Sequence, residues 1–197
     1  MTDIILASGS PRRKELLQQI HLPFTVQTSH VDETISNELS PEDIVTQLAE
    51  RKARAVAAEV SNKYVIGADT VVVQDGVVLG KPKDRDEARH MLKKLSGHTH
   101  AVYTGVAIIH NDDTFTFYEK TNVTFWELLD EDIEAYLDSG EPFDKAGAYG
   151  IQGLGAVHVK SIEGDYFSVV GLPIASLYRH LKRLGFNGRS TSSPSEK

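Results

Sequence analysis

The 197-residue chain contains no cysteine. This excludes a disulfide framework, a zinc site built on thiolates and a thiol nucleophile. Long apolar runs are also missing, because no stretch approaches the length needed to cross a membrane. The first residues lack a signal-peptide pattern, since Asp3 precedes a very short apolar run. We therefore expect a cytoplasmic protein without a membrane partner.

Positive charge is scarce overall. The chain has 21 Lys and Arg residues against 28 Asp and Glu residues, which gives a net charge of −7. A broad nucleic-acid-binding face requires an excess of basic residues, so no nucleic-acid partner is expected. The basic residues nevertheless gather in three short clusters, at positions 12–14, 51–52 and 81–83. If these clusters meet in space, an acidic protein acquires one basic pocket, which suits a small phosphorylated ligand.

The length and the hydrophobic content of 40% are typical of one globular domain. Alternation of apolar strand patterns and helical patterns indicates an α/β fold, which we place over residues 1–186. Residues 187–197 contain few apolar side chains, and we expect them to form a disordered tail.

The first notable stretch follows an apolar run at positions 4–6, which predicts a buried strand. Ser10 suits a helix N-cap and Pro11 the first helical position. Backbone N–H groups and the positive end of the helix dipole would converge at this junction and favour an anion. An ordinary strand–helix turn with solvated arginines also fits, and the local sequence does not decide between the two. The polar residues of the junction are Ser8, Ser10, Arg12 and Arg13.

A carboxylate interrupts the β-branched run 64–73, which predicts a strand. Asp69 in this run should be costly unless it is paired or bound to a cation, which makes it the best single candidate for chemistry. Gly67 before it allows close approach of a ligand or another backbone. Asp75-Gly76 predicts a hairpin that brings Lys81 near Asp69.

Helix signals recur along the chain, and Ser40-Pro41 opens the helix that carries Lys52. A Gly-rich loop over 144–155 contains Gln152, whose amide could read a base edge. Glu33 belongs to an acidic pair after an early strand. His98 and His100 lack a third metal ligand nearby, so we expect structural roles for them. The further predicted elements are helices near 85–95, 130–138 and 173–184, strands over 100–110 and 114–126, and a last hairpin of 157–162 with 166–170.

Six motifs together resemble the Maf family of nucleoside-triphosphate pyrophosphatases, from Ile4 to about Leu184. They are Leu-Ala-Ser-Gly-Ser-Pro-Arg-Arg, Gly-Ala-Asp-Thr-Val, Leu-Gly-Lys-Pro, Leu-Ser-Gly-His-Thr-His, Asp-Lys-Ala-Gly-Ala-Tyr-Gly-Ile-Gln-Gly and Val-Gly-Leu-Pro. The resemblance implies an α/β fold like that of inosine-triphosphate pyrophosphatase, with a long mixed sheet, flanking helices and two lobes around a cleft. It also implies hydrolysis of a nucleoside triphosphate to the monophosphate and pyrophosphate with a divalent cation.

The resemblance assigns roles residue by residue. Asp69 matches the proton acceptor, and substrate choice is tied to Arg12, Thr70 and Gln152. The remaining pocket positions match Ser8, Arg13, Glu33, Lys52 and Lys81, and Ser10 of the opening motif joins them as a phosphate-binding residue. Carboxylate oxygens of Glu33 and Asp69 could hold Mg²⁺ or Mn²⁺. Asp69 could act as base, as metal ligand or as both.

The Gly-Ala-Asp-Thr and Tyr-Gly-Ile-Gln-Gly motifs are similar to the family branch that hydrolyses dTTP and UTP. Modified pyrimidine nucleotides are an alternative substrate class, and 7-methyl-GTP is the substrate of the other branch. A nucleotide-binding regulator of septum formation is a further alternative, which would bind without turnover. The resemblance also implies a homodimer, although no stretch of sequence indicates one.

Overall fold

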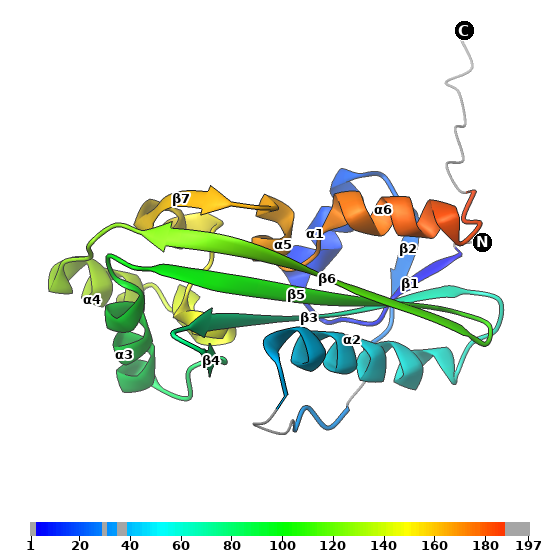
Figure 1. The fold of residues 1–197 in the computed structure, drawn as a ribbon, viewed down its shortest axis with the longest axis horizontal. Coiled ribbons are helices and arrows are strands. Elements are labelled where there is room, and N and C mark those ends of the chain that lie inside the picture. The colour runs from blue at the N-terminus through cyan, green and yellow to red at the C-terminus, as the bar shows by residue number, and fades with distance from the viewer. Residues whose placement is uncertain (1–2, 29–30, 35–38, 188–197) are drawn as a thin grey trace, which may run out of the picture.

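The computed structural model describes residues 3–28, 31–34 and 39–187, so the predicted tail lies outside the described residues except for Asn187. Three long strands run along the longest axis of the molecule, with helices on both sides (Figure 1). The predicted mixed sheet flanked by helices is therefore confirmed. The strands are β1 (Ile4–Leu6), β2 (Phe24–Val26), β3 (Tyr64–Gln74), β4 (Val77–Leu79), β5 (Thr99–His110), β6 (Asp113–Phe125) and β7 (Val159–Glu163).

The helices fill the layers on either side of this sheet. Short 3₁₀ helices replace a continuous loop in the Gly-rich region. The α-helices are α1 (Pro11–Gln19), α2 (Pro41–Ala57), α3 (Arg85–Leu95), α4 (Asp130–Asp138), α5 (Tyr166–Val170) and α6 (Ile174–Arg183), and the 3₁₀ helices are η1 (Glu141–Asp144), η2 (Ala146–Ala148) and η3 (Gly153–His158).

The described strands form one sheet in the order β2-β1-β3-β5-β6-β7, with β4 paired to β3. Strand β1 is parallel to β2 and β3, and the other pairings are antiparallel. On one edge of β3, the pairing with β1 ends at Ile66 and the pairing with β4 begins at Val72. No strand of the described chain covers residues 67–71 on that edge, so the sheet has a gap there.

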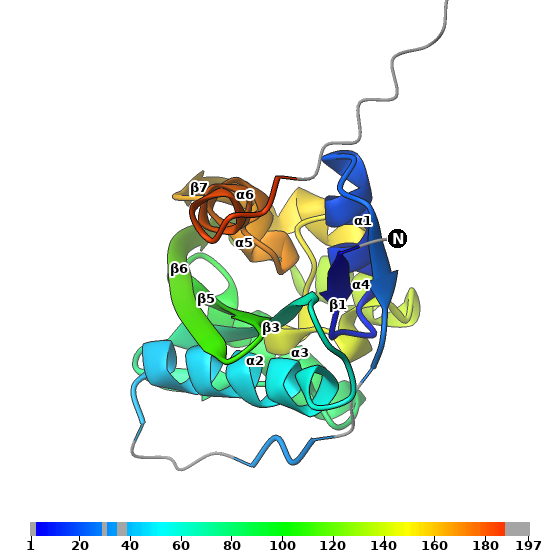
Figure 2. The same cartoon turned by 90° about the vertical axis from the view of Figure 1, so that its right-hand side faces the viewer.

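Helix α2 lies directly on β3 and β5 (Figure 2). Ser40 caps its start, as predicted, by accepting a hydrogen bond from the N–H of Asp43. An added Cβ at Gly67 would collide with the backbone oxygen of Ala49, and one at Gly105 with the carbonyl group of Val45. Both strands therefore need glycine at these positions, because any side chain would push the helix away from the sheet.

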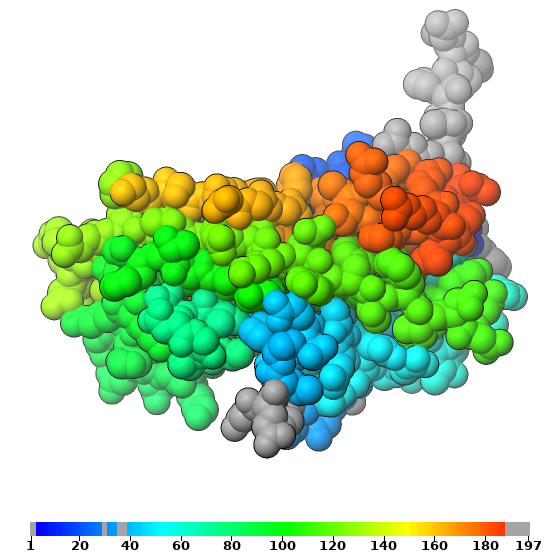
Figure 3. Space-filling model, in the orientation of Figure 1, coloured from blue at the N-terminus to red at the C-terminus, as the bar shows by residue number. Residues whose placement is uncertain are grey.

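The two largest apolar clusters lie at opposite ends of the long strands. One lies under α1 and α6 and contains the fully buried Leu16 and Leu177. The other lies under α3 and α4 and contains the fully buried Leu92 and Leu137. Burial of each such side chain stabilises the fold by about 1.5–3 kcal/mol. An indentation separates α2 from α3 on one side of the elongated molecule (Figure 3). Within the described residues, no helix is long and apolar enough to cross a bilayer.

The predicted last hairpin is wrong in its second half. Residues 166–170 form helix α5, and only Val159–Glu163 is a strand, paired with β6. The aromatic and β-branched residues there favour a strand, but Asp165 caps a helix by accepting from the N–H of Phe167 at 3.0 Å. Thr121 of β6 accepts from the N–H of Asp165 at 2.9 Å and fixes this corner. Tertiary contacts therefore override the local strand preference.

Candidate active site

A cleft of about 610 Å³ opens at the gap in the sheet. Its volume lies in the range of small-molecule sites. The β1–α1 turn, helix α2, strand β3 and the Gly-rich region converge on it from distant parts of the sequence. All ten site residues proposed from the sequence line this cleft, namely Ser8, Ser10, Arg12, Arg13, Glu33, Lys52, Asp69, Thr70, Lys81 and Gln152.

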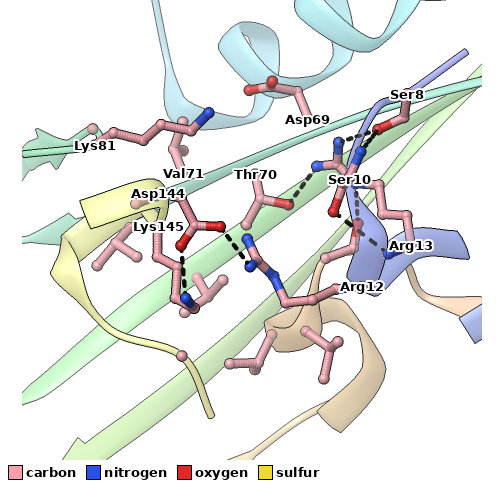
Figure 4. A pocket seen from close by; sticks show the side chains of 18 of the residues that line it. Ser8, Ser10, Arg12, Arg13, Asp69, Thr70, Val71, Lys81, Asp144 and Lys145 are labelled. Carbon is pink, nitrogen blue, oxygen red and sulfur yellow. Dashed lines mark hydrogen bonds and ion pairs between the residues drawn. The ribbon is translucent and has the colours of Figure 1, made fainter. Parts of the chain in front are cut away.

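The β1–α1 turn supplies the arginines. Ser10 accepts from the N–H of Arg13 and caps α1, and Pro11 is the first helical residue, as predicted. The Arg13 side chain is held by three oxygens: the Nη1 donates to Ser8 Oγ at 3.2 Å, the Nη2 to Thr70 Oγ1 at 3.1 Å, and the Nε to the Gly171 carbonyl at 2.8 Å. Burial lowers the pKa of Arg13 from its ordinary value. Arg13 is thus a fixed, oriented positive charge (Figure 4).

Asp69 and Lys52 form the central ion pair, with Lys52 Nζ 2.6 Å from Asp69 Oδ1. Their side chains are only 13% and 14% exposed, so water screens this pair far less than a surface pair. Lys52 also lies 2.9 Å from a carboxylate oxygen of Glu33, which is 61% exposed. The hydrogen bond from Lys52 lowers the pKa of Glu33, so this carboxylate stays ionised at neutral pH.

The position of Lys52 follows from the packing of α2. Gly67 allows the helix backbone to touch β3 two residues before Asp69, so Lys52 reaches over the carboxylate. A lysine in the middle of a helix usually faces solvent. The helical pattern around Lys52 was therefore weak evidence for a site residue, and the contact between Lys52 and Asp69 depends on Gly67 in strand β3.

Thr70 points to the other face of the strand. Its hydroxyl accepts from Arg13 and lies 2.8 Å from the hydroxyl of Thr104, which donates to the Ser168 carbonyl at 2.7 Å. Thr104 and Ser168 are fully buried and had not been singled out from the sequence. The chain of hydroxyl groups ties Arg13 to β5 and α5, and so sets its orientation.

Two further charged residues line the cleft and were missed among the site candidates. Asp144 lies between Arg12 and Lys145, at 3.1 Å from the Arg12 Nη1 and 2.7 Å from the Lys145 Nζ (Figure 4). Both residues belong to the Asp-Lys-Ala-Gly motif, which was a visible signal. Lys81 reaches the cleft after the β3–β4 hairpin, as predicted, and Gln152 lines it from the Gly-rich region.

The described lining is cationic. It contains five Lys and Arg side chains and three Asp and Glu side chains, although the whole chain carries a net charge of −7. The cations are Arg12, Arg13, Lys52, Lys81 and Lys145. Such a cleft can hold several phosphate groups, because guanidinium and ammonium groups neutralise their oxygens.

The histidines set aside from the sequence lie away from this chemistry. His100 is 3% exposed, and its Nε2 is 2.7 Å from the hydroxyl of Tyr149. His98 is exposed in a turn, with its Nδ1 2.6 Å from the Ser96 carbonyl oxygen. Among the described residues, no group of three or more His, Cys, Asp or Glu side chains is arranged to hold a metal ion.

The α/β sheet thus carries a cationic cleft between a strand–helix turn and a largely shielded lysine–carboxylate pair, and such a cleft suits polyanionic ligands. Residues 3–184 match the model of one family, the Maf-like proteins, and the chain belongs to that family.

Curated relatives and one solved structure give further comparisons. A Bacillus cereus protein named dTTP/UTP pyrophosphatase is 60% identical over 183 residues, which cover 93% of this chain and 96% of that protein. A Bacillus anthracis protein of the same name is 58% identical over 187 residues, which cover 95% and 98%. The Staphylococcus aureus Ham1 protein aligns in structure with a TM-score of 0.46 and 17% identity, over 62% of this chain and 71% of that chain.

Proposed function

We propose that this chain hydrolyses dTTP and UTP to the nucleoside monophosphate and pyrophosphate. The observation that carries the proposal is the shielded Lys52–Asp69 pair at the edge of a cleft with an excess of positive charge. The names of the 58–60% identical relatives, which cover nearly the whole chain, support the choice of substrate. Because nucleoside triphosphates are cytosolic metabolites, we place the enzyme in the cytoplasm.

In the proposed reaction, the lining cations bind the phosphate groups and orient the α-phosphorus towards the edge of β3. Asp69 Oδ takes a proton from a water molecule, whose oxygen attacks the α-phosphorus. The bond between this phosphorus and the bridging oxygen breaks, and pyrophosphate leaves. Lys52 balances the charge of Asp69, and Arg13 stabilises negative charge that develops on the phosphoryl oxygens.

The donor set also fits a divalent cation. Two carboxylates, Glu33 and Asp69, lie beside the same ammonium group of Lys52, at 2.9 and 2.6 Å, so one oxygen of each carboxylate lies near the other. Mg²⁺ and Mn²⁺ prefer oxygen ligands, and Mg²⁺ commonly uses one or two carboxylates together with substrate phosphates and water. When bound, the cation would supply charge neutralisation and electrophilic activation of a phosphoryl oxygen.

Substrate choice is assigned to the cleft wall made by Arg12, Thr70 and Gln152. Gln152 offers a donor and an acceptor on one planar group, which suits the O4 and N3–H edge of uracil and thymine. Modified pyrimidines that keep this edge would also be accepted. We also propose a homodimer, and this part of the proposal rests only on the resemblance to the family.

The test is pyrophosphate release from dTTP, UTP, CTP and 7-methyl-GTP, each with Mg²⁺ and with Mn²⁺. The proposal predicts turnover of dTTP and UTP, with lower kcat/KM for the other two and none in excess EDTA. Binding of dTTP without turnover under every metal condition would instead favour a nucleotide-binding regulator. A preference for 7-methyl-GTP would assign the other substrate class.

A further inference from the structure

Residues 150–155 make a tight turn that presents Ile151 and Gln152 to the cleft. Glu141, at the start of η1, is not among the described residues that line the cleft. Its carboxylate nevertheless binds the far side of this turn. The sequence analysis gave Glu141 no role, and neither the proposed reaction nor the binding of phosphate groups uses it.

Three donors converge on the Glu141 carboxylate. The N–H of Leu154 donates to Oε2 at 2.9 Å, and the N–H of Gly155 donates to Oε1 at 3.2 Å. The hydroxyl of Tyr136 donates to Oε1 at 3.0 Å. Burial acts to raise the pKa of Glu141, but these donors lower it below its ordinary value, so the carboxylate is ionised whenever the enzyme works near neutral pH.

The other end of the turn is held by the same pair of side chains. The hydroxyl of Tyr136 accepts from the N–H of Gly150 at 3.1 Å, so Tyr136 joins Gly150 to the Glu141 carboxylate. Lys145 donates to the Glu141 carbonyl at 2.6 Å, and its Cε would lie 2.8 Å from a Cβ placed on Gly150. Both ends of the turn are therefore fixed, and the two residues between Gly150 and Gly153 have little freedom to move.

We propose that Glu141, acting with Tyr136, is a positioning residue that sets base selectivity by holding Gln152 in the cleft. This inference rests on the proposed function, because it takes a nucleoside triphosphate as the ligand and Gln152 as the residue beside its base. A carboxylate can accept all three hydrogen bonds at once, whereas an amide presents N–H groups to one of the donors. Replacing Glu141 therefore loosens the turn without removing a group that contacts the phosphates.

The experiment measures dissociation constants of the α,β-imido analogues of dTTP and dGTP by calorimetry, for the wild type and the variants E141A, E141Q and Y136F. The matched control is E134Q. Glu134 on α4 also accepts several hydrogen bonds, from Arg85 and Arg89, but these bonds join α4 to α3 and do not involve residues 150–155. Hydrogen–deuterium exchange of residues 150–155 in the unliganded protein gives a second readout, and thermal unfolding verifies that each variant folds.

We expect E141A to reduce the ratio of dGTP-analogue to dTTP-analogue dissociation constants at least tenfold, through weaker binding of the dTTP analogue. E141Q and Y136F should give smaller losses in the same direction, with faster exchange at Leu154 and Gly155. The control should keep the wild-type ratio. An unchanged ratio in E141A overturns the inference, whether both analogues bind as in the wild type or both bind equally more weakly. A wild type that binds both analogues with equal affinity also overturns it. A wild type that binds selectively but hydrolyses no triphosphate would refute only the proposed function.

Discussion

Protonation of His100 should destabilise the fold at acidic pH. The ring is 3% exposed, its Nε2 faces the hydroxyl of Tyr149, and its Nδ1 is buried without a hydrogen-bond partner among the described groups. Burial lowers the pKa of His100 from 6.5 to about 4. A protonated ring would carry an unpaired N–H and a charge within an apolar cluster that contains Phe125, at 5.0 Å between ring centroids.

The sign and size of the effect follow from linkage. In the unfolded chain His100 binds a proton near its ordinary pKa of 6.5, whereas the folded chain binds it only near pH 4. Between these values the unfolded state holds more protons, so the free energy of unfolding falls as the pH falls. Each tenfold difference in proton affinity is worth about 1.4 kcal/mol. The full loss is about 3 kcal/mol, and it levels off below pH 4.

The assay is urea unfolding of the wild type and the variant H100Q at intervals from pH 7.5 to pH 4. A glutamine can still form a hydrogen bond with the hydroxyl of Tyr149 but does not titrate, so the variant should lose about 3 kcal/mol less over this interval. H98Q is the matched control, because His98 is exposed in a turn. Equal slopes of unfolding free energy against pH for the wild type and H100Q would refute the reasoning.

Three further predictions address the packing, the arginine and the cation. G67A should lower the free energy of unfolding by about 1–3 kcal/mol in urea titrations, because the added methyl group collides with α2. G80A should change it by less than about 0.5 kcal/mol, because among the described residues no atom beyond the chain neighbours lies within 4 Å of the added Cβ. R13K should reduce kcat/KM for dTTP at least tenfold, because a single ammonium nitrogen lacks the planar fork with which Arg13 contacts Ser8, Thr70 and Gly171 from three nitrogens. K14A removes an exposed side chain and should stay within twofold of the wild type, and equal effects of the two substitutions would contradict the fixed role of Arg13. Turnover lost in EDTA should return on addition of Mg²⁺ or Mn²⁺ but not of Na⁺, and full activity in EDTA would exclude the cation.

Local chemistry made much of the fold predictable. Ser10 and Ser40 precede prolines that begin helices, and the positive φ angles of Asp75 and Gly76 match the predicted hairpin turn. These signals depend on a few neighbouring residues. Helix α5 was not predicted, because its five residues are rich in aromatic and β-branched side chains and show no helical period. Its stability comes from hydrogen bonds of Thr121 and Ser168.

The sequence predicted ten residues that line the cleft, but it predicted neither Asp144 and Lys145 nor the contacts among the lining residues. The motifs indicated the charged residues, whereas the pairing of Arg12 with Asp144 joins positions 132 residues apart. The pairing of Lys52 with Asp69 requires the close approach that Gly67 allows, which no helical pattern reveals. Glu141 gave no signal, because its role depends on backbone N–H groups of a turn that has no regular period.

Pyrophosphate release from dTTP by the wild type and by D69N tests the central proposal most directly. Asparagine has nearly the same shape as aspartate but cannot take a proton from water, and loss of a general base typically costs about 10²–10⁴-fold in rate. We expect D69N to fold, to keep binding the α,β-imido analogue of dTTP, and to lose at least about a hundredfold in kcat. Near wild-type turnover in a folded D69N would contradict the assignment of the reaction to this carboxylate.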